Sequence, residues 1–158
     1  MPEAAHARAE ITLRFLAAPT DAGQSGSVSA GRVLEWIDKA GYAAAAGWSG
    51  TYAVTAYVGN VRFTRPVEVG ELVEVSARVV HTGRTSMHVT VDVASGQPAT
   101  RVLEPATRCL MVFVSVDEHG ASTPVRELVP RTLGEALEQQ WAARRSELRR
   151  EVEAAMGE

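Results

Sequence analysis

The chain has 158 residues, about the length of one domain. Its 46% hydrophobic and 22% charged residues are typical of a soluble globular protein, and a net charge of −3 argues against nucleic-acid binding through overall charge. A single cysteine, Cys109, excludes an internal disulfide and a CxxC metal site. No apolar run is long enough to span a bilayer, and the first ten residues lack the apolar core of a signal peptide, so we expect a cytoplasmic protein without membrane insertion.

The first third of the chain predicts a strand, a long loop and a helix. Residues 1–8 are polar and alanine-rich, and we expect them to be disordered. Alternating apolar residues predict a strand over 11–16, and residues 17–30 form a Gly- and Ser-rich loop of a length that is usually functional. Over 31–48, spacings of three and four predict a helix whose small residues let it lie close to a sheet. Its apolar stripe is Leu34, Ile37, Gly41, Ala44 and Trp48.

After Gly50 the apolar pattern changes to period two. It predicts four antiparallel strands near residues 51–65, 73–80, 87–93 and 101–116, and a phase change near Gly59–Asn60 indicates a bulge. One helix and one sheet make an α+β domain, whose open edge invites pairing with a second copy. Residues 128–158 form a tail in which 133–156 is a second helix.

Several common catalytic motifs are missing from the sequence. The four histidines are scattered, so we expect no metal site. There is no G-x-S-x-G for a serine hydrolase, and no G-x-G-x-x-G follows a strand.

Asp38 and the loop that precedes the first helix are the remaining candidates for chemistry. Asp38 is next to Ile37 of the apolar stripe, and at the border of the core desolvation would raise its pKa and favour a general base. The loop 23–31 leads to a helix N-terminus, where free backbone amides polarise a carbonyl oxygen. The plainer interpretation is an ordinary helix-flank aspartate and a flexible loop with Ser29 as the N-cap. Together the two features allow attack of water on a polarised carbonyl.

Four segments resemble hotdog-fold acyl-CoA thioesterases of the YciA type or the brain acyl-CoA hydrolase type, over roughly residues 9–127. The family has four characteristic segments. They are a helix with the pattern xLLxxMDxAA, a segment with the pattern FxxPVxVGD, a strand–turn–strand segment and a final segment with the pattern VAVDxxGKP. The corresponding segments here are 33–40 (VLEWIDKA), 61–71 (VRFTRPVEVGE), 81–87 (HTGRTSM) and 114–120 (VSVDEHG).

The resemblance implies a hotdog fold, in which an antiparallel sheet wraps around one long central helix. It also implies homodimers that pair through their sheets, with active sites at the interface, and hexamers built as trimers of dimers are common. The implied reaction is hydrolysis of acyl-CoA to free acid and CoA, with no metal and no cofactor beyond the CoA of the substrate.

The resemblance also implies roles for single residues. Asp38 falls on the family's catalytic aspartate, which acts as general base or nucleophile. Ala30 and Gly31 replace the usual Gly-Gly, whose amides face the thioester oxygen. Gly23 stands where the family has an asparagine that orients substrate or water, and Ser29 replaces an aromatic residue or histidine.

CoA phosphates would be held by arginine, which pairs bidentately with phosphate. The candidates are Arg84, Thr85 and Ser86 at a turn, with Arg62 and Arg65 beside Phe63; the plainer interpretation of the first group is a β-hairpin turn. An acyl-CoA thioesterase is the leading hypothesis. The alternative is a catalytically weak hotdog protein that binds acyl-CoA or another acyl thioester. A hotdog hydratase is disfavoured, because no histidine lies between His6 and His81.

Overall fold

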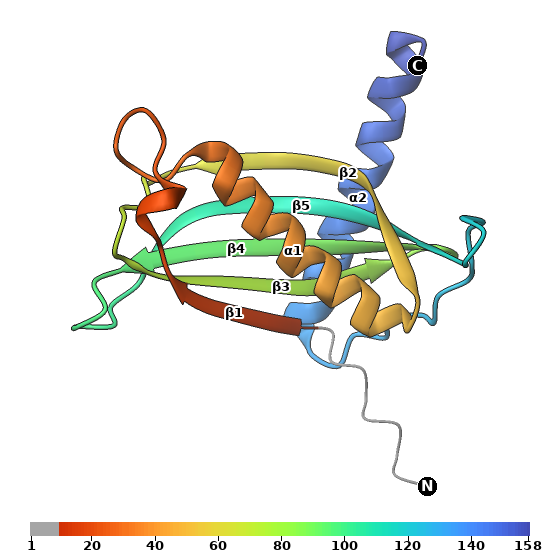
Figure 1. Cartoon of the computed structure of the whole chain (residues 1–158). Helices are drawn as coiled ribbons and strands as arrows, with labels where there is room; N and C mark the ends of the chain where they lie inside the picture. Colours follow the sequence, from red (N-terminus) through yellow and green to blue (C-terminus); the bar gives the residue numbers. More distant parts are fainter. Residues whose placement is uncertain (1–9) are drawn as a thin grey trace, which may run out of the picture.

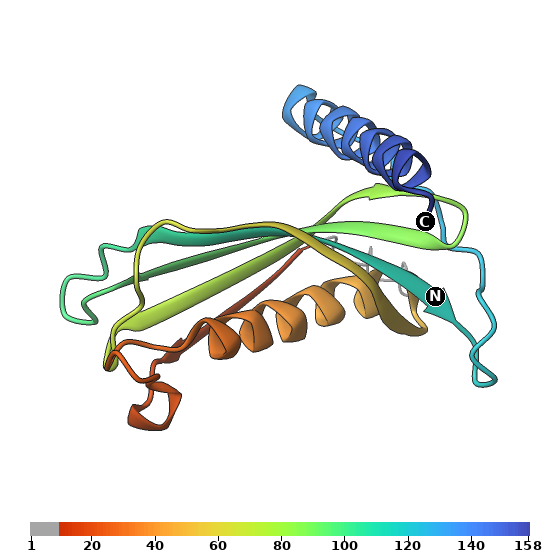
Figure 2. The same ribbon diagram turned by 90° about the horizontal axis from the view of Figure 1, so that it is seen from above.

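The computed structural model describes residues 10–158, so the disorder expected for residues 1–8 lies outside the described residues. The strands are β1 (Glu10–Leu16), β2 (Tyr52–Phe63), β3 (Leu72–Thr82), β4 (Ser86–Gly96) and β5 (Glu104–Val116), and the helices are α1 (Ala30–Ser49) and α2 (Leu133–Met156). All strands pair antiparallel in one sheet, in the order β1-β3-β4-β5-β2 (Figure 1). The sheet curves around α1, and α2 lies over its opposite face (Figure 2). The predicted α+β architecture with one central helix is confirmed.

Helix α1 lies close to the sheet, as its small residues predict. Ser29 caps its N-terminus, where the Ser29 Oγ accepts a hydrogen bond from the Arg32 N–H at 3.2 Å, and Gly50 caps its C-terminus with a left-handed φ of 70°. A Cβ at Gly41 would lie 2.9 Å from Met111 Sδ and 3.0 Å from Phe113 Cε2. The position therefore has no room for a side chain, and the sheet approaches the helix backbone directly.

The buried face of α1 is wider than the predicted stripe. Ile37, Gly41 and Ala44 are buried as expected, but Leu34 and Trp48 are only half-buried. A curved sheet contacts more than one row of a helix, so a second row of side chains is covered. These additional buried residues are Val33, Trp36, Ala40 and Ala45.

The bulge predicted in β2 is confirmed. The pairing of β2 with β5 changes register between Gly59 and Arg62, and Asn60 has a φ of 52°. Two predicted strand limits were wrong. β2 ends at Phe63, two residues before the predicted end at Arg65. β5 begins at Glu104 rather than at Arg101, which lies in the connection from β4 and has a φ of 55°.

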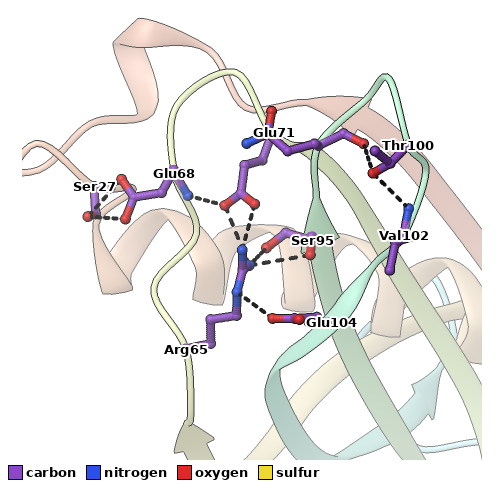
Figure 3. Close-up of polar contacts among 9 residues, drawn as sticks. Ser27, Arg65, Glu68, Glu71, Ser95, Thr100, Val102 and Glu104 are labelled. Carbon is purple, nitrogen blue, oxygen red and sulfur yellow. Dashed lines mark hydrogen bonds and ion pairs between the residues drawn. The ribbon is translucent and has the colours of Figure 1, made fainter.

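A buried ion pair fixes the connection between β2 and β3. Glu71, whose side chain is 3% exposed, pairs with Arg65 at 2.8 Å between Oε2 and Nη2, and it accepts the Glu68 N–H at 2.7 Å (Figure 3). Arg65 also donates to the hydroxyl and carbonyl oxygens of Ser95 and pairs with Glu104 at 3.3 Å. We call Arg65, Glu71 and Ser95 the clamp.

The clamp holds the loop before α1 as well. The Ala17 N–H donates to the Glu71 carbonyl at 2.9 Å, and the Val28 N–H donates to the Val67 carbonyl at 2.9 Å. The Ser27 hydroxyl donates to the Glu68 carboxylate at 3.0 Å. The start of α1 is therefore positioned by the segment that the clamp fixes.

Replacing Glu71 should destabilise the protein strongly. Burial by itself raises the pKa of Glu71, but the hydrogen bonds from Arg65 and the Glu68 N–H outweigh it, and the pKa is lowered. Glu71→Gln should cost about 3 kcal/mol at pH 7 in denaturant unfolding, since Arg65 loses its buried partner. Glu74→Gln, which breaks the more exposed pair with Arg14, should cost under about 1 kcal/mol.

The pH dependence of the folding stability tests the same ion pair. A carboxyl whose pKa is lower in the folded state contributes stability above its unfolded pKa, and that contribution is lost as the pH falls through the folded pKa. Below about pH 4.5, wild type should therefore lose more stability than Glu71→Gln. Parallel pH curves for the two proteins would contradict an ionised Glu71.

Candidate active site

Asp38 and Thr55 form a hydrogen-bonded pair between α1 and β2. The Thr55 Oγ1 donates to Asp38 Oδ1 at 3.0 Å, which fixes one carboxylate oxygen. Asp38 is exposed, so the expected desolvation at the border of the core is wrong for a single chain. Sequence reasoning missed Thr55 because the pair joins residues 17 positions apart on different elements.

The pair lies beside an uncovered strand edge. β2 hydrogen-bonds to β5 on one side only and is the last strand of the sheet. Its large apolar side chains are exposed: Tyr52 by 61%, Val54 by 39% and Val58 by 47%. An apolar edge of this kind is typical of a surface that another chain covers.

The start of α1 offers two backbone donors. Within the described chain, the N–H groups of Ala30 and Gly31 have no protein acceptor, as expected for a first helical turn. Both residues are exposed, and the space beside Gly31 is open. Gly31 and Asp38 lie on the same face of α1, but two turns separate them, about 10 Å along the axis. One chain therefore does not place both groups around one carbonyl carbon.

The loop before α1 is held by its own hydrogen bonds. The Gly23 N–H donates to the Ser27 carbonyl at 2.7 Å, and the Gly26 N–H donates to the Gly23 carbonyl at 3.1 Å. Asp21 accepts the Ala18 N–H and pairs with Arg32 at 3.2 Å, which ties the loop to the first turn of α1. A Cβ at Gly23 would lie 3.1 Å from Ser29 Cβ, so the loop is tightly closed there.

The candidate phosphate ligands are not brought together within one chain. The β2 end that carries Arg62 and the β3–β4 hairpin lie at opposite ends of the sheet (Figure 1). Arg84 is exposed in that hairpin, and the backbone of Thr85 and Ser86 is used in pairing with Ser115 and Gly83.

Arg65, a third candidate for the CoA phosphates, has partners within its own chain. Its guanidinium contacts Glu71 and Ser95 in the clamp and also pairs with Glu104. We therefore assign Arg65 to the fold, and Arg62 and Arg84 remain exposed candidates.

Residues 10–158 contain neither a candidate metal site nor a helix that could span a membrane. No group of three or more His, Cys, Asp or Glu side chains there is arranged to hold a metal ion. No helix in this part of the chain is long and apolar enough to cross a membrane.

Comparison with known proteins places the chain in a family. The thioesterase superfamily profile matches residues 25–101. The acyl-CoA thioester hydrolase YciA of Salmonella typhimurium is 32% identical over 119 residues, which cover 73% of this chain and 90% of that protein.

Solved structures agree with the sequence match. An apo-hexameric acyl-CoA thioesterase superposes with a TM-score of 0.89 at 32% identity, over 94% of this chain and 96% of that one. An acyl-CoA hydrolase from Bacillus cereus gives a TM-score of 0.86 at 27% identity, over 94% and 91%. The chain therefore belongs to the hotdog-fold acyl-CoA thioesterase family of the thioesterase superfamily.

Proposed function

We propose that the chain hydrolyses acyl-CoA thioesters to a free acid and CoA, with Asp38 as the group that activates the attack. The observation that carries the proposal is the Asp38–Thr55 pair at the exposed β2 edge. The names of the relatives, acyl-CoA thioester hydrolase and acyl-CoA thioesterase, support the substrate class.

The hydrogen bond from Thr55 orients the Asp38 carboxylate for general acid–base catalysis. Because the hydroxyl occupies Oδ1, Oδ2 is free to accept a proton from water. The water oxygen attacks the thioester carbonyl carbon, and backbone N–H groups such as those of Ala30 and Gly31 stabilise the oxyanion. The C–S bond then breaks and the CoA thiolate leaves. In the alternative route Asp38 attacks the carbonyl carbon itself, and water hydrolyses the resulting anhydride.

A second copy of the chain completes the site in this proposal. Pairing of two β2 edges would cover Tyr52, Val54 and Val58 and exclude water from the Asp38 side. It would also let one copy supply Asp38 and the other the loop 23–31, which accounts for the two turns between Asp38 and Gly31. The structural relative with a TM-score of 0.89 is a hexamer, which supports assembly beyond the monomer.

The loop keeps one competing function open. Gly23 has no side chain to orient a water or the thioester, and a side chain there would press on Ser29. These two facts favour a catalytically weak protein that binds acyl-CoA without rapid turnover. Hydrolysis assays on acyl-CoAs of increasing chain length, followed by release of free thiol, separate the two functions.

Asp38→Asn should lower kcat by about 10²–10⁴-fold, because the amide cannot take a proton from water. Thr55→Val should lower kcat about tenfold, since the carboxylate loses the donor that fixes it. Thr12→Val, which removes an exposed hydroxyl on β1, is the matched control and should leave kcat unchanged. Turnover of Asp38→Asn near that of wild type would exclude the mechanism.

Two substitutions at Gly23 separate its steric cost from the missing amide. Gly23→Ala adds the Cβ that meets Ser29, and it should lower or preserve kcat/KM. Gly23→Asn adds the same Cβ together with a donor, so it should exceed Gly23→Ala by about tenfold or more. Equal values for the two variants would mean that no side-chain donor acts from this position.

Arg84→Gln should raise KM for acyl-CoA about tenfold with little change in kcat, because an exposed guanidinium that holds phosphate acts on binding alone. An acyl-pantetheine thioester lacks the nucleotide phosphates, and its KM should not change. Arg14→Gln, at an exposed ion pair on β1, serves as the control. A similar rise of KM for both substrates would place Arg84 away from the phosphates.

A further inference from the structure

Helix α2 turns its apolar side chains away from its own chain. Six large apolar residues along one face are exposed by 42–77%. We call them the α2 stripe. They are Leu133, Leu137, Trp141, Leu148, Val152 and Met156.

The face that α2 presents to the sheet is small and polar instead. Ala142 is its one buried residue, Glu138 pairs with Arg78, and the Arg149 guanidinium lies 4.3 Å from the centroid of the Tyr57 ring. An amphipathic helix normally places its apolar stripe against the core of its own domain. The reversed orientation leaves the α2 stripe free for another surface.

The spacing of the α2 stripe is the same from either end. Its residues are separated by 4, 4, 7, 4 and 4 positions, and the centre falls between Arg144 and Arg145. In an antiparallel pair of identical helices, Leu133 would face Met156, Leu137 would face Val152 and Trp141 would face Leu148. A two-fold contact requires this kind of self-complementary pattern.

We propose that the α2 stripe pairs with the α2 stripe of a second copy, antiparallel about a two-fold axis between Arg144 and Arg145. Ion pairs near the axis partly offset its positive charge. Arg144 pairs with Glu147 within the chain at 3.2 Å, and the antiparallel register brings each Arg144 beside the partner's Glu147. Arg145 of each copy also lies at the axis, so four arginines and two glutamates meet there.

The area of the α2 stripe also fits a second copy. Its exposed side chains amount to roughly 700 Å² per copy, close to the ~800 Å² per partner of a standard interface. This contact lies on the sheet face opposite α1, away from Asp38, so it does not depend on the proposed chemistry. Combined with pairing along β2, it gives each chain two different two-fold interfaces, and such contacts join dimers into larger closed assemblies.

The mass of the assembly tests the contact. Trp141→Glu places a charge in the middle of the α2 stripe, and the mass from light scattering should fall to that of a dimer. Ala154→Glu adds the same charge at an exposed α2 position outside the stripe, and the mass should stay that of wild type. Acyl-CoA hydrolysis should persist in both variants. An unchanged mass for Trp141→Glu would overturn the proposal.

Cross-linking tests the register. Cys109 is buried, so any disulfide between chains forms through the introduced cysteines. Leu137→Cys combined with Val152→Cys should give a disulfide-linked pair of chains on mild oxidation, and Leu137→Cys alone should not. Linkage by Leu137→Cys alone would indicate a parallel pair. Absence of linkage together with binding of wild type to phosphatidylglycerol vesicles would assign the α2 stripe to a lipid surface. Either result would overturn the proposal.

Discussion

The ion pair between Arg65 and the buried Glu71 is the interaction on which the position of α1 depends. Taking the Glu71 carboxylate out of water is costly unless hydrogen bonds satisfy it, and here the Arg65 guanidinium and the Glu68 N–H do so. Arginine suits this role better than lysine, because its planar guanidinium reaches several acceptors at once. The segment 64–71 is thereby rigid enough to hold the loop 17–29 by backbone hydrogen bonds.

A second constraint fixes the distance between α1 and the sheet. With no side chain at Gly41, the helix backbone rests on Met111 and Phe113. At the far end of the helix, the Trp48 indole donates to the Arg126 carbonyl at 3.1 Å, and the Arg126 guanidinium lies over the same ring. A helix held at both ends and in the middle has little freedom to rotate. Asp38 therefore meets Thr55 through the placement of the whole helix rather than through a local turn.

Local patterns were sufficient for most of the fold. Period two predicted the strands, the phase change predicted the bulge at Asn60, and α2 was predicted to the residue at both ends. The sequence patterns failed where the partner of a side chain lies far away in the chain. Arg65 looks like an exposed ligand beside Phe63, and only the fold brings Ser95 to it. No feature of the sequence distinguishes Thr55 from the other threonines in strands.

The orientation of α2 shows the same limit in a different form. Periodicity identifies an apolar stripe but not the surface that covers it, and here the sheet takes the polar face through Arg78 and Tyr57. The chain thus has two uncovered apolar surfaces of different geometry. The β2 edge offers backbone hydrogen bonds and lies beside Asp38, whereas the α2 stripe offers only side chains on the other face of the sheet. In the proposed function, a contact through the first surface controls the access of water to Asp38 and so affects the chemistry. The proposed contact through the α2 stripe lies on the other face of the sheet and affects only how many sites are held together, so the two proposals make assembly and catalysis separable.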